Sequence, residues 1–260
     1  MTVRLPRLLS TLYEKFLYSA TDRLGLISFF FQTAFKPSEF VYKIAEDSFW
    51  VRKNSSDILA LKEVYVKKHY GEKPSGVVVD IGANIGAFSV YASNTADRVY
   101  AIEPESSNYA QLIKNIHLNK RGGRIVPFRV AAGPENKKVL LYKGRFNKGA
   151  SSTMRPRTGG SEVVEMVSLS HLINDLGINE INLLKIDVEG GEYDLLYNLP
   201  NEKFEKINKV VLEYHYVTGE SPIALTSYLA SLGYKVTMHN GLGFLVGTGI
   251  IEAVKEKRGE

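Results

Sequence analysis

The sequence predicts an α/β fold in which helices cover both faces of a mostly parallel sheet. From residue 71 onward, short apolar runs alternate with stretches of helical spacing. The runs are hydrophobic at nearly every position rather than at alternate positions, which is typical of strands buried on both faces. A tight turn with two glycines follows the first run, and such turns join a parallel strand to the next helix.

The expected elements follow in chain order. Upstream of residue 71 we expect a hairpin of Phe40–Ile44 and Ser48–Arg52, then a helix over Ile58–Tyr70 capped by Ser55, Ser56 or Asp57. Five parallel strands are expected at Val77–Asp80, Arg98–Ile102, Ile125–Ala131, Leu183–Val188 and Lys209–Tyr214. Helices are expected after Gly86, over Ser107–Asn119, after Gly191 and over Pro222–Leu232. The last two runs, Tyr234–Met238 and Gly243–Val246, should pair antiparallel across a short turn at His239–Leu242.

This pattern divides the chain into two expected parts. Residues 1–70 form a helical and hairpin extension, and residues 71–260 form the main domain. The segment Lys137–Leu169 interrupts the alternation between the third and fourth parallel strands, and we expect β-structure around a glycine-rich loop there.

Composition excludes several classes of chemistry. Hydrophobic residues make up 44% of the 260 residues and charged residues 23%, which is typical of globular proteins and excludes disorder throughout the chain. The absence of cysteine excludes disulfides, thiolate zinc sites, iron–sulfur clusters and cysteine nucleophiles. The net charge of +5 indicates an acidic partner only where it is clustered.

The positive charge does cluster, in the predicted β insertion. No acidic residue occurs among residues 137–157, whereas seven positions are basic: Lys137, Lys138, Lys143, Arg145, Lys148, Arg155 and Arg157. They form either a solvated loop or a wall that attracts phosphate, carboxylate or nucleic acid.

The first 35 residues are expected to contain an amphipathic helix. Positions 5, 8, 9, 12, 13, 16 and 17 are all Leu, Tyr or Phe, which lie on one side of a helix. Such a helix packs on the main domain or on a second copy in a homodimer; peripheral contact with a membrane is the alternative. Charges interrupt any signal-like run, and uncharged residues 24–35 fall short of the roughly 20 that span a bilayer. We therefore expect a cytoplasmic protein, membrane-peripheral under the alternative.

Two strand ends predict a nucleoside site. The run Val77–Gly86 reads VVVDIGANIG, whose glycines let a ligand approach the backbone. A dinucleotide fingerprint would instead require glycine at Asn84 and Ala87. Asp80 could meet the cationic amino-acid end of S-adenosylmethionine, whereas it would repel a pyrophosphate. Glu103 ends the second strand about 20 residues later, where a carboxylate accepts both ribose hydroxyls, and NAD would use the same acid.

The fourth and fifth parallel strands end in a second polar group. Asp187 and Glu189 follow the fourth strand, and two-residue spacing would place them on one face if the strand continues that far. Glu213 and His215 end the neighbouring strand. Carboxylates beside an imidazole suit a general base for a hydroxyl group.

Together these residues resemble the FkbM family of S-adenosylmethionine-dependent methyltransferases, over roughly residues 50–245. The resemblance rests on four motifs: the loop Asp80–Gly86, the pair Glu103–Pro104, the run Lys185–Gly190 and the strand end Glu213–His215. It implies a class I methyltransferase fold: a Rossmann-like, seven-stranded, mostly parallel sheet, here with a helical N-terminal extension and a β insertion between strands 3 and 4. It also implies O-methylation of sugar or polyketide hydroxyls.

The resemblance assigns residues by position. Asp80, Gly82, Asn84 and Gly86 would hold the methionine part of the cofactor, and Glu103 the ribose. Ala131 and Ala132 would border the adenine, where the sequence offers no acid for the adenine amino group.

We therefore predict an O-methyltransferase that acts on a hydroxyl of a sugar, glycan or related small molecule, with an acidic acceptor suggested by the basic insertion. His215 or Asp187 would accept the proton, with Glu189 orienting. Asp187 and Glu189 could hold Mg²⁺, but we do not expect it and predict no metal ligands.

Two alternatives stay open. The first is an RNA or DNA methyltransferase, which the basic insertion favours. However, amino-group methylation usually needs an Asn/Asp-Pro-Pro-aromatic pattern, which Asp187–Gly190 lacks. Methylation of a base carbon through a cysteine nucleophile is excluded because the chain has no cysteine. We therefore expect no nucleic-acid partner. The second is an NAD(P)-linked oxidoreductase, which Asn84 and Ala87 disfavour.

Overall fold

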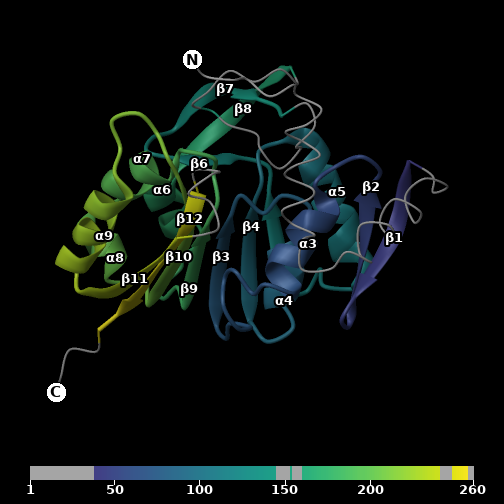
Figure 1. Ribbon diagram of the computed structural model, residues 1–260, viewed down its shortest axis with the longest axis horizontal. Helices are drawn as coiled ribbons and strands as arrows, with labels where there is room; N and C mark the ends of the chain where they lie inside the picture. The colour runs from purple at the N-terminus through teal and green to yellow at the C-terminus, as the bar shows by residue number, and fades with distance from the viewer. Residues whose placement is uncertain (1–37, 145–152, 154–159, 241–247, 257–260) are drawn as a thin grey trace, which may run out of the picture. The chain divides into compact units, whose positions relative to one another are not determined.

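A computed structural model of the chain describes residues 38–144, 153, 160–240 and 248–256 (Figure 1). The chain divides into two compact units, residues 1–40 and 41–260. The expected boundary at residue 70 differs from this division, because residues 41–70 belong to the larger unit. The expected N-terminal helix lies outside the described residues, so its homodimer and membrane alternatives stay predictions. No helix among the described residues is long and apolar enough to cross a membrane.

The larger unit is built on a seven-stranded sheet with the order β11-β12-β10-β9-β3-β4-β5. The strands are β3 (Val77–Ile81), β4 (Arg98–Ile102), β5 (Ile125–Phe128), β9 (Leu183–Ile186), β10 (Lys209–His215), β11 (Tyr234–Asn240) and β12 (Thr248–Lys255). The first five run parallel, and β12 lies antiparallel to both β10 and β11. This confirms the Rossmann-like, seven-stranded fold. The chain changes direction across the sheet between β3 and β9, and α/β proteins bind ligands at such a switch point.

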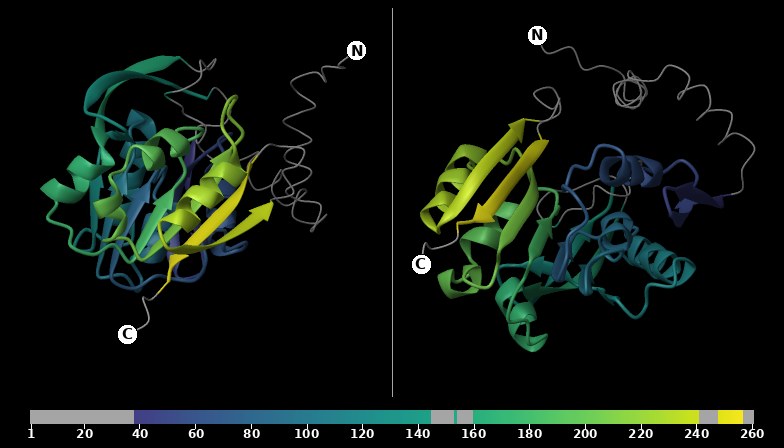
Figure 2. Two further views of the ribbon diagram at one scale, coloured as in Figure 1. Left: turned by 90° about the vertical axis from the view of Figure 1, so that its left-hand side faces the viewer. Right: turned by 90° about the horizontal axis from the view of Figure 1, so that it is seen from below.

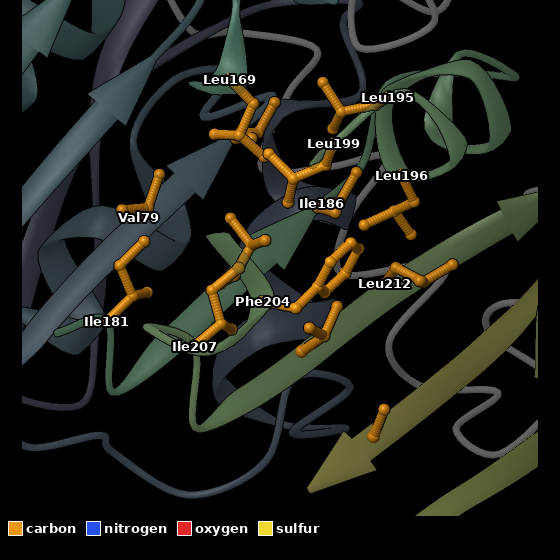
Figure 3. Close-up of a cluster of buried hydrophobic side chains, with 14 of the residues drawn as sticks. Val79, Leu169, Ile181, Ile186, Leu195, Leu196, Leu199, Phe204, Ile207 and Leu212 are labelled. Carbon is orange, nitrogen blue, oxygen red and sulfur yellow. The ribbon is translucent and has the colours of Figure 1, made fainter. Parts of the chain in front are cut away.

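Helices cover both faces of this sheet, as the two views of Figure 2 show. One face carries α6 (Leu169–Asp175), α7 (Glu192–Tyr197), α8 (Asn201–Phe204) and α9 (Pro222–Ser231), whose apolar side chains form one core with β3, β9, β10 and β12. Figure 3 shows part of that core, with Phe204 and Leu212 among the labelled side chains. On the other side, α4 (Ala87–Ala92) contacts β3 and β4, α5 (Ser106–Leu118) contacts β5, and α3 (Asp57–Tyr65) contacts α4.

Alternation along the strands decides which side chains reach which face. Val79 and Ile81 of β3 join the core with α6–α9, so Asp80 between them points to the α4 side. Leu184 and Ile186 of β9 join the same core, which directs Lys185 to the α4 side as well. Two opposite charges therefore lie on one face of neighbouring strands.

The insertion forms a separate three-stranded sheet, with the order β6-β8-β7. Its strands are β6 (Ala131–Gly133), β7 (Lys137–Tyr142) and β8 (Ser161–Ser168), and four buried side chains form its core: Ala131, Leu141, Val164 and Met166. The β insertion is thus confirmed. The third parallel strand was predicted too long, because it ends at Phe128 and Ala131 begins β6.

Other element ends also differ from the prediction. The hairpin is confirmed as β1 (Glu39–Ile44) and β2 (Asp47–Arg52). The helix expected to reach Tyr70 ends at Tyr65, and the chain turns at Lys68, which has a positive φ. The strand expected to reach Val188 ends at Ile186, so Asp187 and Glu189 lie beyond it and the two-residue spacing does not apply. The last strand is Thr248–Lys255; the expected strand at 243–246 lies outside the described residues.

Candidate active site

The glycine loop after β3 packs so closely that two of its positions accept only glycine. Gly82 has φ +77°, and a Cβ there would lie 1.8 Å from the carbonyl oxygen of Asp187. Gly86 has φ +85° at the start of α4, and a Cβ there would lie 2.6 Å from a methyl carbon of Leu112. Gly82 therefore lets the loop contact the exit of β9, and Gly86 lets α4 pack against α5.

Asp80 and Lys185 form a buried ion pair beneath this loop. Asp80 is 0% exposed and Lys185 is 3% exposed, and Lys185 Nζ lies 3.1 Å from Asp80 Oδ1. Ser89 Oγ donates to Asp80 Oδ2 at 2.5 Å. Burial by itself would lower the pKa of Lys185, but the carboxylates of Asp80 and Asp187 outweigh it and raise that pKa. Asp80 is thus fully buried against Lys185, and its predicted contact with a cationic ligand stays a prediction.

Two groups can accept hydrogen bonds from a ligand: Asn84 of the loop and Glu103, which follows β4. The Asn84 N–H donates to Glu103 Oε2 at 2.8 Å, and the Glu105 N–H donates to Glu103 Oε1 at 2.9 Å. Burial raises the pKa of Glu103 to about 7, although these bonds favour its charged form. Asn84 Oδ1 is buried and has no hydrogen-bond partner among the described residues. A buried acceptor without a partner is costly, which fits a site that a donor group on a ligand completes.

Asp187 follows β9 and packs against Gly82 of the loop, with Tyr70 and Glu213 as its neighbours. The Tyr70 hydroxyl donates to Asp187 Oδ2 at 3.2 Å, and burial raises the pKa of Tyr70, so the hydroxyl keeps its proton. Glu213 at the end of β10 is half-buried; burial first, and then repulsion from Asp187, raise its pKa to about 8. At neutral pH Glu213 therefore tends to keep its proton.

His215 is held between two carboxylates. Its Nδ1 lies 3.2 Å from Glu192 Oε1, and its Nε2 lies 3.7 Å from Glu189 Oε2. Its backbone N–H also donates to Glu192 Oε1, at 2.6 Å, and its carbonyl accepts from the Tyr193 hydroxyl at 3.0 Å. Burial would lower the pKa of His215, but the hydrogen bond to Glu192 and the charges of Glu189, Glu192 and Asp187 raise it to about 9. With a pKa of about 9, His215 would hold a proton at neutral pH, and its role as the proton acceptor stays a prediction.

The structure thus brings the predicted cofactor-loop and catalytic residues together at the carboxyl ends of β3, β4, β9 and β10. Ala131 contributes its side chain to the core of the small sheet, and Ala132 packs against the main core. Their place beside an adenine stays a prediction. Within the described residues, no group of three or more His, Asp or Glu side chains could hold a metal ion.

The described basic residues of the insertion are mostly paired. Lys143 Nζ lies 3.0 Å from Glu105 Oε1 and 3.3 Å from Glu162 Oε1, and Lys137 Nζ lies 2.6 Å from Glu135 Oε1. Four of the seven basic positions fall outside the described residues: Arg145, Lys148, Arg155 and Arg157. An acid-attracting wall therefore stays a prediction.

Three further side chains contact the predicted site residues and were not predicted as site residues themselves: Lys185, Tyr70 and Glu192. A signal for Lys185 exists, because it is a lone cation within the apolar run Leu183–Ile186. Tyr70 lies 117 positions from Asp187, and no local pattern announces such a contact.

Comparison with known proteins identifies the family of this chain. The model of the methyltransferase FkbM domain matches residues 80–236, more than half of the chain. The hexuronic acid methyltransferase AglP of Haloferax volcanii is 27% identical over 166 residues, 63% of this chain and 66% of AglP. The 31-O-demethyl-FK506 methyltransferase FkbM of Streptomyces tacrolimicus is 29% identical over 212 residues, 70% of this chain and 77% of that protein.

A crystal structure of an FkbM methyltransferase from Methylobacillus flagellatus KT aligns with a TM-score of 0.48 and 18% identity, over 75% of this chain and 52% of that protein. This chain therefore spans about half of that protein's length. Family membership also decides against the NAD(P)-linked oxidoreductase. The chain belongs to the FkbM family of methyltransferases.

Proposed function

We propose that this protein transfers a methyl group from S-adenosylmethionine to a hydroxyl oxygen of a sugar, glycan or related small molecule. The observation that carries the proposal is the meeting of two groups of residues at the switch point of the sheet. The glycine loop, with the unpartnered Asn84 Oδ1 and the carboxylate of Glu103, lies over the exit of β9. The acid and imidazole groups of Asp187, Glu189 and His215 follow at the next strand ends.

The loop residues suit the cofactor. Gly82 and Gly86 keep the loop free of side chains, and Asn84 Oδ1 offers an acceptor for the ammonium group of the methionine part. Each Glu103 oxygen uses one lone pair on a backbone N–H, which leaves acceptor capacity for two ribose hydroxyls. When bound, S-adenosylmethionine supplies a methyl group on a sulfonium, which is an electrophile with a good leaving group.

The chain's own part is to orient the acceptor hydroxyl, exclude water and receive the hydroxyl proton. Asp187 is the better placed of the two proton acceptors that the sequence suggested, because His215 already carries a proton at neutral pH. The Tyr70 hydroxyl fixes one oxygen of Asp187 and leaves the other for the substrate. The His215 cation holds Glu189, which can then orient the acceptor. Alignment and proton transfer together supply roughly 10 kcal/mol in comparable reactions.

The acceptor class is supported by the names of two relatives. One is described as acting on a hexuronic acid and the other on a 31-O-demethyl compound. We propose a hydroxylated acceptor of this kind, with an acidic sugar as the first choice.

The test is methyl transfer by the purified protein from labelled S-adenosylmethionine to a panel of hexuronic acids, neutral sugars and hydroxylated polyketides. We expect label in a hydroxylated member of the panel and micromolar binding of S-adenosylhomocysteine by calorimetry. The matched control is Asp187→Asn, which should bind S-adenosylhomocysteine but transfer little label. Absence of cofactor binding would overturn the proposal, and salt-sensitive methylation of RNA would favour the nucleic-acid alternative instead.

A further inference from the structure

We propose that Lys185 is a positioning residue that fixes the glycine loop in its cofactor-binding shape, and that the charge of Asp80 serves Lys185 rather than the cofactor. The inference rests on the proposed function only for the measurements of cofactor binding. It assigns to Lys185, on β9, the role of holding the loop that follows β3.

The contacts of Lys185 converge on the first turn of the loop. Lys185 Nζ donates to the Gly82 carbonyl at 2.8 Å and lies 3.4 Å from the Ile81 carbonyl. The third neighbour is the Asp80 carboxylate, at 3.1 Å, and the face of the Tyr70 ring lies 5.1 Å from Nζ to its centroid. The ammonium group is thus surrounded by two carbonyls, one carboxylate and one aromatic face, and it is almost completely buried.

The peptide group between Gly82 and Ala83 is also held by β4, on the side opposite Lys185. The N–H groups of Gly82 and Ala83 both donate to the Ile102 carbonyl, at 3.0 Å each. With Lys185 on its carbonyl, Gly82 is bound to β4 through its N–H and to β9 through its oxygen. Asn84 lies two residues after Gly82, and its N–H donates to the Glu103 carboxylate at the end of β4. A change in the orientation of the Gly82 carbonyl would therefore move Asn84 and disturb its bond to Glu103.

The burial of the Asp80–Lys185 pair indicates that Asp80 interacts with Lys185 rather than with a ligand. Asp80 has no exposed surface: Ser89 Oγ donates to its Oδ2, and its Oδ1, which accepts no hydrogen bond from the described residues, lies 3.1 Å from the Lys185 ammonium group. A carboxylate buried against an ammonium group in this way leaves no face open to a ligand cation. Removing one partner of a buried ion pair leaves an uncompensated charge, which is strongly unfavourable, whereas replacing both partners together is often tolerated. Comparing single with double replacements therefore shows whether Asp80 balances the charge of Lys185 or contacts the cofactor directly.

The experiment compares Lys185→Gln, Asp80→Asn and the double variant Asp80→Asn/Lys185→Gln. The glutamine amide can still donate to the Gly82 carbonyl, and the double variant buries no charge. Two quantities are measured: hydrogen exchange of the peptide that contains residues 77–92 in unliganded protein, and the dissociation constant of S-adenosylhomocysteine.

We expect each single variant to exchange faster in this peptide and to bind S-adenosylhomocysteine at least about tenfold more weakly, because each leaves one buried charge unpaired. The double variant should recover to within about threefold of the natural protein in both measurements. In turnover, Lys185→Gln should raise the KM for S-adenosylmethionine more than it lowers kcat, which a general loss of stability would not do.

Lys255 offers a matched control. Its Nζ donates to the Phe204 carbonyl at 3.0 Å, lies 2.9 Å from Glu205 Oε2 and lies 5.9 Å from the Tyr234 ring centroid. It therefore has the same kinds of neighbour, but its backbone is bonded to Asn208 beside the start of β10, at the opposite end of that strand from His215. Lys255→Gln should lower the melting temperature without changing exchange in residues 77–92 or S-adenosylhomocysteine affinity.

Equal weakening in Asp80→Asn and in the double variant would overturn the inference, because it would assign the Asp80 charge to the ligand. Unchanged loop exchange in Lys185→Gln would overturn it as well. If Lys185→Gln does not fold, recovery in the double variant relative to Asp80→Asn decides the question. If the natural protein binds no S-adenosylhomocysteine, the proposed function fails, whereas hydrogen exchange still decides the role of Lys185.

Discussion

Glu103 combines burial with a position at which it would contact the cofactor. Burial raises its pKa to about 7, within the range in which cells operate. The ionised form accepts hydrogen bonds on both oxygens, whereas protonation turns one oxygen into a donor, so a nucleoside whose two hydroxyls donate to Glu103 binds the charged form better. Cofactor affinity and the protonation of this residue are therefore linked.

The first prediction concerns this linkage. The affinity for S-adenosylhomocysteine should increase as the pH rises from about 6 to about 8, because the fraction of ionised Glu103 increases over that range. Glu103→Gln should bind about tenfold more weakly and lose this dependence, since its amide cannot titrate. Calorimetry at a series of pH values measures both effects, and a flat profile for the natural protein would contradict the assignment.

The second prediction concerns Asp187 and its Tyr70 partner. Asp187→Asn should lower kcat about 100-fold or more, because the proton acceptor is lost, with S-adenosylhomocysteine affinity little changed. Tyr70→Phe removes only the hydroxyl that orients Asp187 and keeps the ring near Lys185, so kcat should fall several-fold. Steady-state kinetics and calorimetry separate turnover from binding. Full activity of Asp187→Asn would remove this residue from the mechanism.

The third prediction concerns His215, which the surrounding carboxylates keep charged up to a pKa of about 9. If it anchors Glu189, His215→Ala should lower kcat much more than cofactor affinity, because Glu189 loses its cationic neighbour. If it were instead the base, kcat of the natural protein would rise with pH through about 9, and that rise would vanish in His215→Ala. The pH–rate profiles of both proteins distinguish these outcomes.

At the scale of elements, the sequence was most informative where local pattern and tertiary role agree. The strand Arg98–Ile102 was predicted with its observed bounds, and β3 differs by one residue, because both are apolar runs that end at a polar residue or a turn. The exit of β9 was missed because Val188 continues the apolar pattern after the strand has ended.

The end of α3 was missed for a related reason. Val66 and Tyr70 extend the helical spacing, but the chain turns at Lys68 and sends Tyr70 to Asp187 instead. In the site, motifs pointed to Gly82, Gly86 and Glu103, because a glycine turn after a strand and an acid at a strand end are local patterns of the sequence. Tyr70, Lys185 and Glu192 depend on contacts between distant segments, and the charge of His215 depends on three carboxylates brought together by folding.

The fourth prediction concerns the attachment of the small sheet to α5. Glu162 of β8 accepts from the Ser106 N–H at 2.8 Å and lies 3.3 Å from Lys143, so it binds the first turn of α5 beside the Glu103 segment. Glu162→Ala should lower stability by about 1 kcal/mol, as the loss of a helix cap does, and should speed hydrogen exchange in β7 and β8. Glu165→Ala, exposed on the same strand, is the control and should change neither. Equal exchange in the two variants would contradict this attachment.

The fifth prediction concerns the whole molecule, because three site groups shift in the same direction. Folding raises the pKa of Glu103, Glu213 and His215. The folded state therefore binds more protons than the unfolded state between about pH 5 and 9, so stability falls as the pH rises across this window.

The unfolding free energy should therefore be highest at mildly acidic pH, and it should decrease toward pH 9 by on the order of a few kcal/mol. Glu103→Gln/Glu213→Gln should flatten the decrease between about pH 5 and 8 and leave the part due to His215. Urea unfolding at fixed pH values is the measurement. A stability that increases with pH would contradict these three shifts.

The position of β12 has a consequence for how the protein is made. β12 is the last of the seven strands along the chain, yet it lies between β10 and β11 and pairs antiparallel with β10 from Lys209 to His215. While translation proceeds, β3, β4 and β9 can leave the ribosome and begin to assemble, but the strand that carries Glu213 and His215 has an open edge. The nascent chain can therefore bring the glycine loop and Glu103 together before β10, which carries Glu213 and His215, has both of its neighbouring strands.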